Sequence, residues 1–377
     1  METHFPQVQD SHEAREYNRL QRRLTLADAL LGLAMLAVVL VTGWSADFRD
    51  FTSRISGGSN YVLALFLYVL LLSLISRVIS FPLDYYGYRV EHRYKLSNQK
   101  LRSWLWDEGK GYLLGLAFSS ILSELMYLLI RKEPNYWWLW AWAIFLALFV
   151  ALAQLAPVLL FPIFYRFRAL ENDALRDRLT RLSERAGAKV RGVYEWKLSG
   201  KSKKANAALM GLGQTRRIVL ADTLLANYTD DEIEAVLAHE LGHHVHNHIL
   251  KSIGMQAVIS FAGFWVVKTI LRKPFPDWYS SQADFANLPL ILLVATVISL
   301  LLLPILNAYS RFNERQADQY AWKSIASIGP FLSAMNKLAA QNLAERVPSR
   351  WVEILFHSHP SISKRVAAAE RWANTRA

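Results

Sequence analysis

Long apolar stretches dominate the pattern of hydrophobic and polar positions along the chain. A helix of about 20 residues crosses the hydrocarbon core of a bilayer, and six runs are long enough to do so: 26–44, 61–81, 112–130, 136–164, 249–271 and 288–309. The fourth run is overlong and contains Pro157 and Pro162, so we expect it to tilt, kink or extend past the bilayer. The pattern predicts six transmembrane helices.

The longest polar stretch lies between the fourth and fifth apolar runs. Residues 172–188 are charged with a helical period, and runs at 192–196, 205–212 and 217–221 have the composition of strands. We expect a small sheet of two or three strands here. Thr229 and Glu232 then form a capping box, which predicts the start of a helix.

Lysine and arginine are distributed unevenly among the segments that connect the apolar runs. The segments poor in them hold Arg49 and Arg54, Arg131 and Lys132, and Arg272 and Lys273. The other connections and both termini are rich in them, and rich and poor segments alternate. Because cytoplasmic loops collect positive charge, we expect both termini and the long polar stretch to be cytoplasmic.

Composition supports an integral membrane protein with a substantial water-facing part. Apolar residues make up 53% of the 377 residues, yet charged residues still reach 20%. The net charge of +12 is explained by the positive charge that cytoplasmic loops collect. No nucleic-acid-binding motif accompanies it, so we expect no nucleic-acid partner. The apolar runs predict a lipid bilayer as partner. The chain has no cysteine, so disulfides and thiolate ligands are excluded and any metal must be held by histidine and carboxylate.

The helix opened by the capping box carries the sequence His239-Glu240-Leu241-Gly242-His243. Residues four apart share a helix face, so His239 and His243 can present two imidazoles to one Zn²⁺ ion. Glu240 is then placed to act on a water molecule as general base. The alternative is that these histidines lie on a solvated helix face.

A third protein ligand is required, and its identity separates classes of zinc hydrolase. A third histidine six positions after His243 is absent, because Ile249 occupies that place. A glutamate on a second helix is the usual alternative, and we assign Glu314, which follows the sixth apolar run. Asp318, one turn later, can accept a hydrogen bond from a ligand histidine. An ordinary charged helix end is the alternative for both acidic residues.

The remaining histidines are predicted to have lesser roles. His244, His246 and His248 are interpreted as residues at the surface or around the ligands, because a fourth protein ligand would close the position that water needs. His357 and His359 lie in a turn-like segment near the C-terminus.

Taken together, these motifs resemble the integral-membrane zinc metallopeptidases of the type I CaaX prenyl protease family, metallopeptidase family 48, and we expect a bacterial homologue. The resemblance rests on the HExxH residues, Glu314 with Ala317-Asp318, Asn206-Ala207-Ala208-Leu209-Met210-Gly211, Arg217-Ile218-Val219-Leu220, Asp222-Thr223-Leu224-Leu225, and His359-Pro360-Ser361 with Arg365. It covers residues from about 85 to 371.

The resemblance implies one catalytic zinc per chain at the cytoplasmic end of a helical barrel around a water-filled chamber. It implies that Asn206 and Ala207 contact the substrate backbone along an edge strand. His359 becomes a candidate donor to the transition-state oxyanion, and Arg365 a supporting basic residue. Eukaryotic members usually have seven spans, whereas six are predicted here, and a smaller bacterial quality-control protease with fewer spans is the alternative relative.

The predicted fold is a mainly α polytopic membrane protein of about six transmembrane helices enclosing a chamber, with a gluzincin-type catalytic domain containing a small β-sheet. We expect an N-terminal membrane region at 1–165 and a cytoplasmic catalytic region at 166–248. A transmembrane hairpin at 249–309 and a C-terminal catalytic region at 310–377 complete the division.

The predicted function is a zinc metalloendopeptidase of the bacterial inner membrane with its active site facing the cytoplasm. Its expected substrates are CaaX-type, membrane-associated or unfolded polypeptides, prenylated ones among them. The alternative hypothesis is a membrane transporter or metal sensor that uses the histidine cluster. Transporters place such groups near mid-membrane in two related halves, and neither feature is visible in this sequence.

Overall fold

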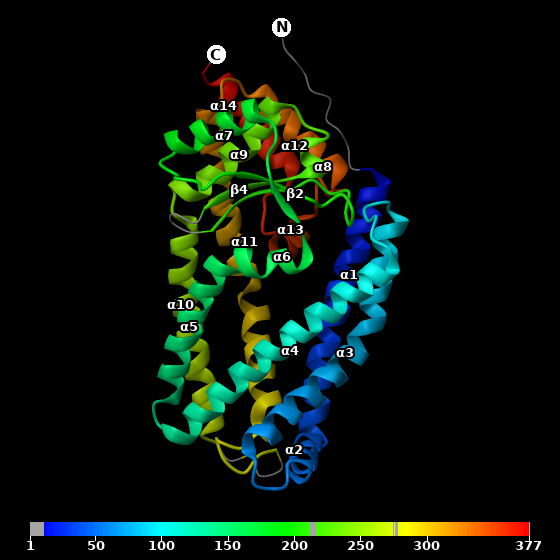
Figure 1. The fold of residues 1–377 in the computed structure, drawn as a ribbon, viewed down its shortest axis with the longest axis vertical. Coiled ribbons are helices and arrows are strands. Elements are labelled where there is room, and N and C mark those ends of the chain that lie inside the picture. The colour runs from blue at the N-terminus through cyan, green and yellow to red at the C-terminus, as the bar shows by residue number, and fades with distance from the viewer. Residues whose placement is uncertain (1–10, 212–215, 274, 276–277, 377) are drawn as a thin grey trace.

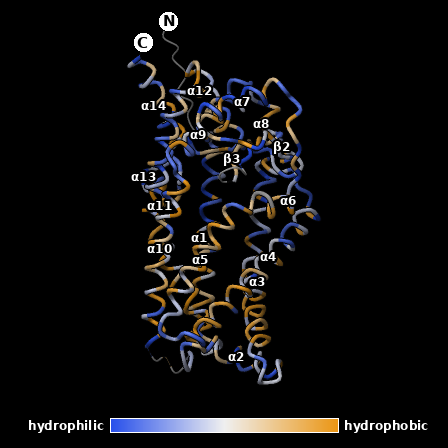
Figure 2. The backbone as a smooth tube through the Cα atoms, turned by 60° about the vertical axis from the view of Figure 1, so that its left-hand side comes forward, coloured by the Kyte–Doolittle hydropathy of each residue, from blue (hydrophilic) through white to orange (hydrophobic). Residues whose placement is uncertain are grey.

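The computed structural model describes residues 11–211, 216–273, 275 and 278–376. Within this part, six helices are long and apolar enough to cross a membrane, as the sequence predicts. They are α1 (His12–Val41), α3 (Tyr61–Arg93), α4 (Leu101–Lys132), α5 (Trp137–Leu159), α10 (His248–Leu271) and α11 (Leu288–Ser324). They form the elongated lower part of the molecule, where hydrophobic residues predominate (Figures 1 and 2).

Several of these helices extend well beyond their apolar runs. α11 continues through residue 309 to Ser324 without a break, so the expected boundary between membrane and catalytic regions falls inside one helix. The overlong run at 136–164, expected to tilt, kink or extend, is interrupted: α5 ends at Leu159, and a short helix α6 (Phe161–Phe164) follows with Pro162 in its first turn. A proline there breaks the hydrogen-bonding pattern of the longer helix. The side chain of Pro157 lies outside the described part.

A polar cap, comprising the sheet and the helices around it, covers one end of the bundle (Figures 1 and 2). Its sheet has four strands in the order β1-β2-β4-β3. These strands are β1 (Phe167–Ala169), β2 (Val193–Trp196), β3 (Ala207–Met210) and β4 (Arg217–Ala221). β2 and β4 are parallel, and the other two pairs are antiparallel. β3 is therefore an edge strand.

The sheet is larger than the predicted two or three strands. The added strand, β1, is only three residues long and follows directly after the fourth membrane helix and α6, so its own sequence gives no alternating pattern. Its pairing with β2 is set by tertiary contact. The predicted strand at 205–212 is shorter than expected, and residue 212 lies outside the described residues.

Helices pack around this sheet and form the hydrophobic core of the cap. They are α7 (Asp173–Arg185), α8 (Asp222–Leu225), α9 (Asp230–Val245), α12 (Gly329–Gln341) and α14 (Ile362–Asn374), whereas α13 (Arg350–Phe356) packs against α11. Leu179, Leu237 and Phe331 from three of these helices are almost completely buried in one cluster with Ile218 of strand β4. This core fixes α9 against the sheet, and α9 carries the HExxH residues.

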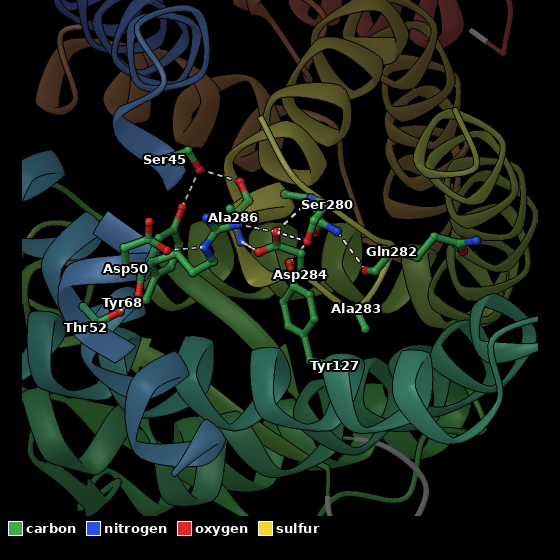
Figure 3. A network of polar contacts seen from close by, with 12 residues as sticks. Ser45, Asp50, Thr52, Tyr68, Tyr127, Ser280, Gln282, Ala283, Asp284 and Ala286 are labelled. Carbon is green, nitrogen blue, oxygen red and sulfur yellow. Dashed lines mark hydrogen bonds and ion pairs between the residues drawn. The ribbon is translucent and has the colours of Figure 1, made fainter. Parts of the chain in front are cut away.

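A buried polar cluster, the far-end network, lies at the end of the bundle opposite the cap (Figure 1), and Figure 3 shows it from close by. There α2 (Trp44–Ile55) and the short helix η2 (Phe285–Asn287) meet α3 and α4. The Tyr127 hydroxyl donates to Oδ1 of Asn287, and Ser45 is hydrogen-bonded to both Tyr68 and the carbonyl of Ala286. All four of these polar side chains are buried, so the network joins the helices at this end.

Candidate metal site

Two helices bring the predicted ligands together. α9 begins with the predicted capping box, in which the Thr229 hydroxyl accepts from the backbone of Glu232 and the Glu232 carboxylate accepts from the backbone of Thr229. α9 packs directly against α11, and a Cβ on Gly242 would lie 2.7 Å from Cα of Ala317. The glycine within HExxH therefore permits an approach that no other residue allows.

His239, His243 and Glu314 form a compact group at this crossing. Their nearest ligand atoms lie within 4.8 Å of one another. Nε2 of His243 is 3.3 Å from Nε2 of His239 and 3.3 Å from Oε1 of Glu314, and Nε2 of His239 is 3.3 Å from Oε2 of Glu314. Ligand atoms about 2.0–2.1 Å from a tetrahedral Zn²⁺ ion are themselves about 3.3 Å apart. The donor set and its spacing fit zinc.

The carboxylate of Glu314 has an unsatisfied oxygen at the centre of this group. Glu314 is 4% exposed, and among the described residues its Oε2 receives no correctly directed hydrogen bond. That oxygen is also 2.8 Å from Nδ1 of His359. A buried carboxylate oxygen that has close neighbours but no well-directed hydrogen bond costs free energy, and a cation bound among the three side chains would satisfy it.

His239 is held from behind by a buried ion pair. Its Nδ1 is 2.8 Å from Oδ1 of Asp318, and the Arg365 guanidinium binds both oxygens of Asp318 at 2.6 and 2.9 Å. Burial alone would lower the pKa of His239, but hydrogen bonds to Asp318 and Glu314 outweigh it and raise the pKa to about 9. Asp318 thus fixes the ring so that Nε2 faces the group of ligands.

His243 has a different kind of support. Its Nδ1 is 2.9 Å from Nδ1 of His248, and Nε2 of His248 is 2.9 Å from Oε1 of Gln316. His248 is 4% exposed, so it lies beside a ligand rather than at the surface. Sequence analysis did not identify Gln316, because its contact depends on how the start of α10 meets α11.

A cleft of about 430 Å³ opens beside the ligands. Asn206, Ala207, Glu240, His359 and Arg365 all contribute to its walls. Among the described residues, the partly exposed Glu240 side chain has no hydrogen-bond or ion-pair partner, although its charge interacts with that of Arg365. Its carboxylate is therefore free to act on a molecule in the cleft.

The structure places the other predicted residues in distinct positions. Asn206 is exposed one residue before the edge strand β3, and Ala207 is the first residue of that strand. The His359 side chain is 63% exposed, so it remains accessible from the cleft. His357 and His244 are half-buried, and burial lowers the pKa of each.

Comparison with known proteins identifies the family. Residues 169–373 match the model of peptidase family M48, and residues 4–166 match that of the CAAX prenyl protease N-terminal region with five membrane helices. The chain is 30% identical to an uncharacterized metalloprotease, YhfN, of Bacillus subtilis, over 96% of this chain and 85% of that protein. It is 29% identical to CAAX prenyl protease 1 of Saccharomyces cerevisiae, over 80% and 70% of the two chains.

The fold has a close counterpart among solved structures. The crystal structure of Ste24p from S. mikatae superimposes with a TM-score of 0.84 at 24% identity, covering 95% of this chain and 88% of that one. These matches favour a peptidase over a transporter or metal sensor. The chain belongs to peptidase family M48 and is a membrane-embedded, CAAX prenyl protease-like member of this metalloprotease family.

Proposed function

We propose that the protein is a zinc metalloendopeptidase with one Zn²⁺ ion held by His239, His243 and Glu314. The observation that carries the proposal is the convergence of these three side chains at zinc spacing beside a cleft lined by the unpaired Glu240. Zinc bound there would acidify a coordinated water and polarise the scissile carbonyl.

The residues around the cleft have separate roles in peptide hydrolysis. Glu240 takes a proton from the attacking water and delivers it to the leaving amine. His359, across the cleft, donates to the oxyanion that develops on the scissile carbonyl. Asp318 and Arg365 keep His239 oriented throughout; both side chains are buried, and Arg365 forms part of the cleft wall.

The edge strand accounts for how a peptide would bind. β3 has one hydrogen-bonded neighbour, β4, within the described sheet, and its first residue lines the cleft. An extended peptide can pair with such an edge through backbone hydrogen bonds, and Asn206 and Ala207 line the same cleft as His239. This mode selects unfolded or terminal segments more than particular sequences.

We further propose that the substrates are CaaX-type, membrane-associated or unfolded polypeptides, with prenylated chains among them. The names of several relatives, including CAAX prenyl protease 1, support this proposal. We also propose that the cap and both termini face the cytoplasm at a bacterial inner membrane, because the Lys- and Arg-rich segments all belong to this side of the six spans.

Metal analysis of detergent-purified protein tests the proposed zinc site. Wild type should contain about one zinc per chain. Glu314→Ala should lose it, and Glu240→Gln should retain it while losing turnover of an unfolded peptide. Folded wild-type protein without zinc would contradict the proposal, and so would an active Glu240→Gln variant.

The orientation can be tested independently because the chain has no cysteine. Asn374→Cys labels the cap and Ser59→Cys labels the opposite end, and both positions are exposed. In intact spheroplasts an impermeant maleimide should modify only the cysteine at position 59. Labelling at position 374 alone would reverse the proposed orientation.

A further inference from the structure

The two histidines of the candidate metal site are supported by partners of different chemistry. Asp318, a carboxylate, contacts His239, whereas a second imidazole, His248, contacts His243 and is itself bonded to Gln316. We call His243, His248 and Gln316 the imidazole chain. Its members come from α9, the first residue of α10, and α11.

The backbone between α9 and α10 is arranged to bring His248 back towards His243. Asn247 has φ 55° and ψ 35°, a left-handed conformation that asparagine tolerates better than most residues. This turn lets α10 begin at His248, whose ring lies edge-on to that of His243 at a centroid distance of 5.0 Å. The turn therefore places the His248 ring against that of His243.

The hydrogen bonds of the imidazole chain restrict which ring nitrogens of His243 and His248 carry protons. Two neutral imidazoles can share a hydrogen between their Nδ1 atoms only if one donates and the other accepts. A ligand histidine needs a lone pair on the nitrogen that faces the cation, so His243 must keep its proton on Nδ1. His248 must then accept at Nδ1 and carry its own proton on Nε2, which requires an acceptor at Gln316.

We propose that His248 and Gln316 are positioning residues that fix the tautomer and orientation of His243 for metal binding. The proposal rests on the zinc site proposed above and adds the role of these two residues. Gln316 sets the direction in which the hydrogen bonds of the imidazole chain donate, because its Oε1 accepts the Nε2 proton of His248. If Gln316 presented only donors, the chain would reverse and place a proton on Nε2 of His243.

The imidazole chain that supports His243 is neutral, whereas the Asp318 carboxylate that supports His239 is negatively charged. His248 and Gln316 provide orientation without adding an anion beside the zinc, which already has the carboxylates of Glu314 and Asp318 close by. A neutral partner donates less electron density to its ligand than a carboxylate does. The arrangement therefore holds His243 in place while leaving the cation more strongly electron-withdrawing.

Zinc affinity of the purified full-length protein, measured by competition with a chelator, tests the proposal. His248→Phe keeps an aromatic ring but removes both nitrogens, and should weaken zinc binding by about 10–100-fold. His248→Asn restores one acceptor and one donor and should recover part of the loss. His244→Phe, next to the same ligand but outside the chain, should bind zinc as wild type does.

Substitutions at Gln316 test the direction of the chain. Gln316→Glu, an acceptor, should retain zinc at least as tightly as wild type, whereas Gln316→Lys, a donor, should lose affinity. Both effects should largely disappear in a His248→Phe background, because the coupling passes through His248. In the Co²⁺-substituted protein, the visible spectrum should change for His248→Phe and stay unchanged for His244→Phe.

The outcomes separate this inference from the proposed function. Wild-type protein that binds no zinc would overturn both. Zinc binding that is normal in wild type and within twofold of it in His248→Phe would overturn the role of His248 alone. Equal effects of Gln316→Lys in both backgrounds would show a simple charge effect and overturn the role of Gln316.

Discussion

The two ends of helix α11 hold buried polar clusters that differ in how completely their groups are paired. Asn287, next to the start of the helix, belongs to the far-end network, and Glu314 belongs to the candidate metal site. In the far-end network, Asn287 accepts from Tyr127 and donates to the carbonyl of Gln282. At the other end, among the described residues, Oε2 of Glu314 has close ion-pair neighbours but no well-directed hydrogen bond, and the partly exposed carboxylate of Glu240 lines the cleft.

This difference separates a structural cluster from one suited to chemistry. Buried polar groups are normally satisfied, since an unpaired one costs about 1–3 kcal/mol. The far-end network follows that rule and holds helices together. The candidate metal site departs from it at the buried Glu314, where a bound cation would supply the missing partner, and its partly exposed Glu240 lines the cleft that a substrate would enter.

Asp318→Asn, at the candidate metal site, should produce the largest loss of stability and of zinc affinity among these variants. The change leaves the buried guanidinium of Arg365 without its anion, which costs about 3–5 kcal/mol of stability. It also weakens the hold on His239. Chemical denaturation in detergent and zinc competition should show both losses together.

A double variant separates the two effects. Removing the stranded charge with Arg365→Gln in the Asp318→Asn background should recover stability but not zinc affinity. Unchanged stability in Asp318→Asn would show that the ion pair does not support the site.

Gly242→Ala should disturb the metal site by moving α9 away from α11. The added Cβ would lie 2.7 Å from Cα of Ala317, and such overpacking costs about 1–3 kcal/mol. Because a displacement of about 1 Å can reduce turnover by about 100-fold, peptidase activity should fall by that order. Gly254→Ala in α10, where a Cβ meets nothing within 4 Å, is the control; equal behaviour of the two variants would contradict this account.

Tyr127→Phe should affect the other end of the molecule alone. It leaves the buried Oδ1 of Asn287 without its donor, which costs about 1–3 kcal/mol. Thermal unfolding should shift to lower temperature, while zinc content and the turnover number at 25 °C remain as in wild type. A loss of zinc in this variant would show that the two ends are coupled.

The contrast also explains what could be predicted from sequence. The six spans, the capping box at Thr229 and the fold class follow from local patterns, and the structure and the family matches confirm them. Glu314 and Asp318 could be nominated because they lie one helical turn apart after an apolar run. Their approach to His239, and every bond of the far-end network, depend on contacts between distant segments that have no local pattern.

The features that sequence analysis missed also depend on contacts between segments that are distant along the chain. β1 is too short to show alternation and is defined by its pairing with β2. Gln316 becomes meaningful only when the left-handed turn at Asn247 places His248 beside it. Local signals therefore nominate the candidate ligands, whereas the groups that orient them can be found only from the fold.

The smallest expected effect concerns Glu232, which joins the start of α9 to α12. Burial would raise the pKa of this carboxyl, but hydrogen bonds from Lys337 and Ser333 outweigh it and hold the pKa below its ordinary value. A lowered folded-state pKa stabilises the protein above the unfolded pKa of about 4.3 and loses that effect as pH falls through the folded value. Glu232→Gln should therefore cost about 1 kcal/mol at pH 7, in the range of a lost helix cap.

The pH dependence distinguishes this charge effect from a packing effect. The difference in unfolding free energy between wild type and Glu232→Gln should shrink as the pH is lowered below about 4, whereas a packing defect would persist at every pH. Because the start of α9 lies two turns before His239, zinc affinity should change little in this variant. A large loss of zinc would mean that the capping box positions the ligands directly, so that α9 is held at its start as well as at Gly242.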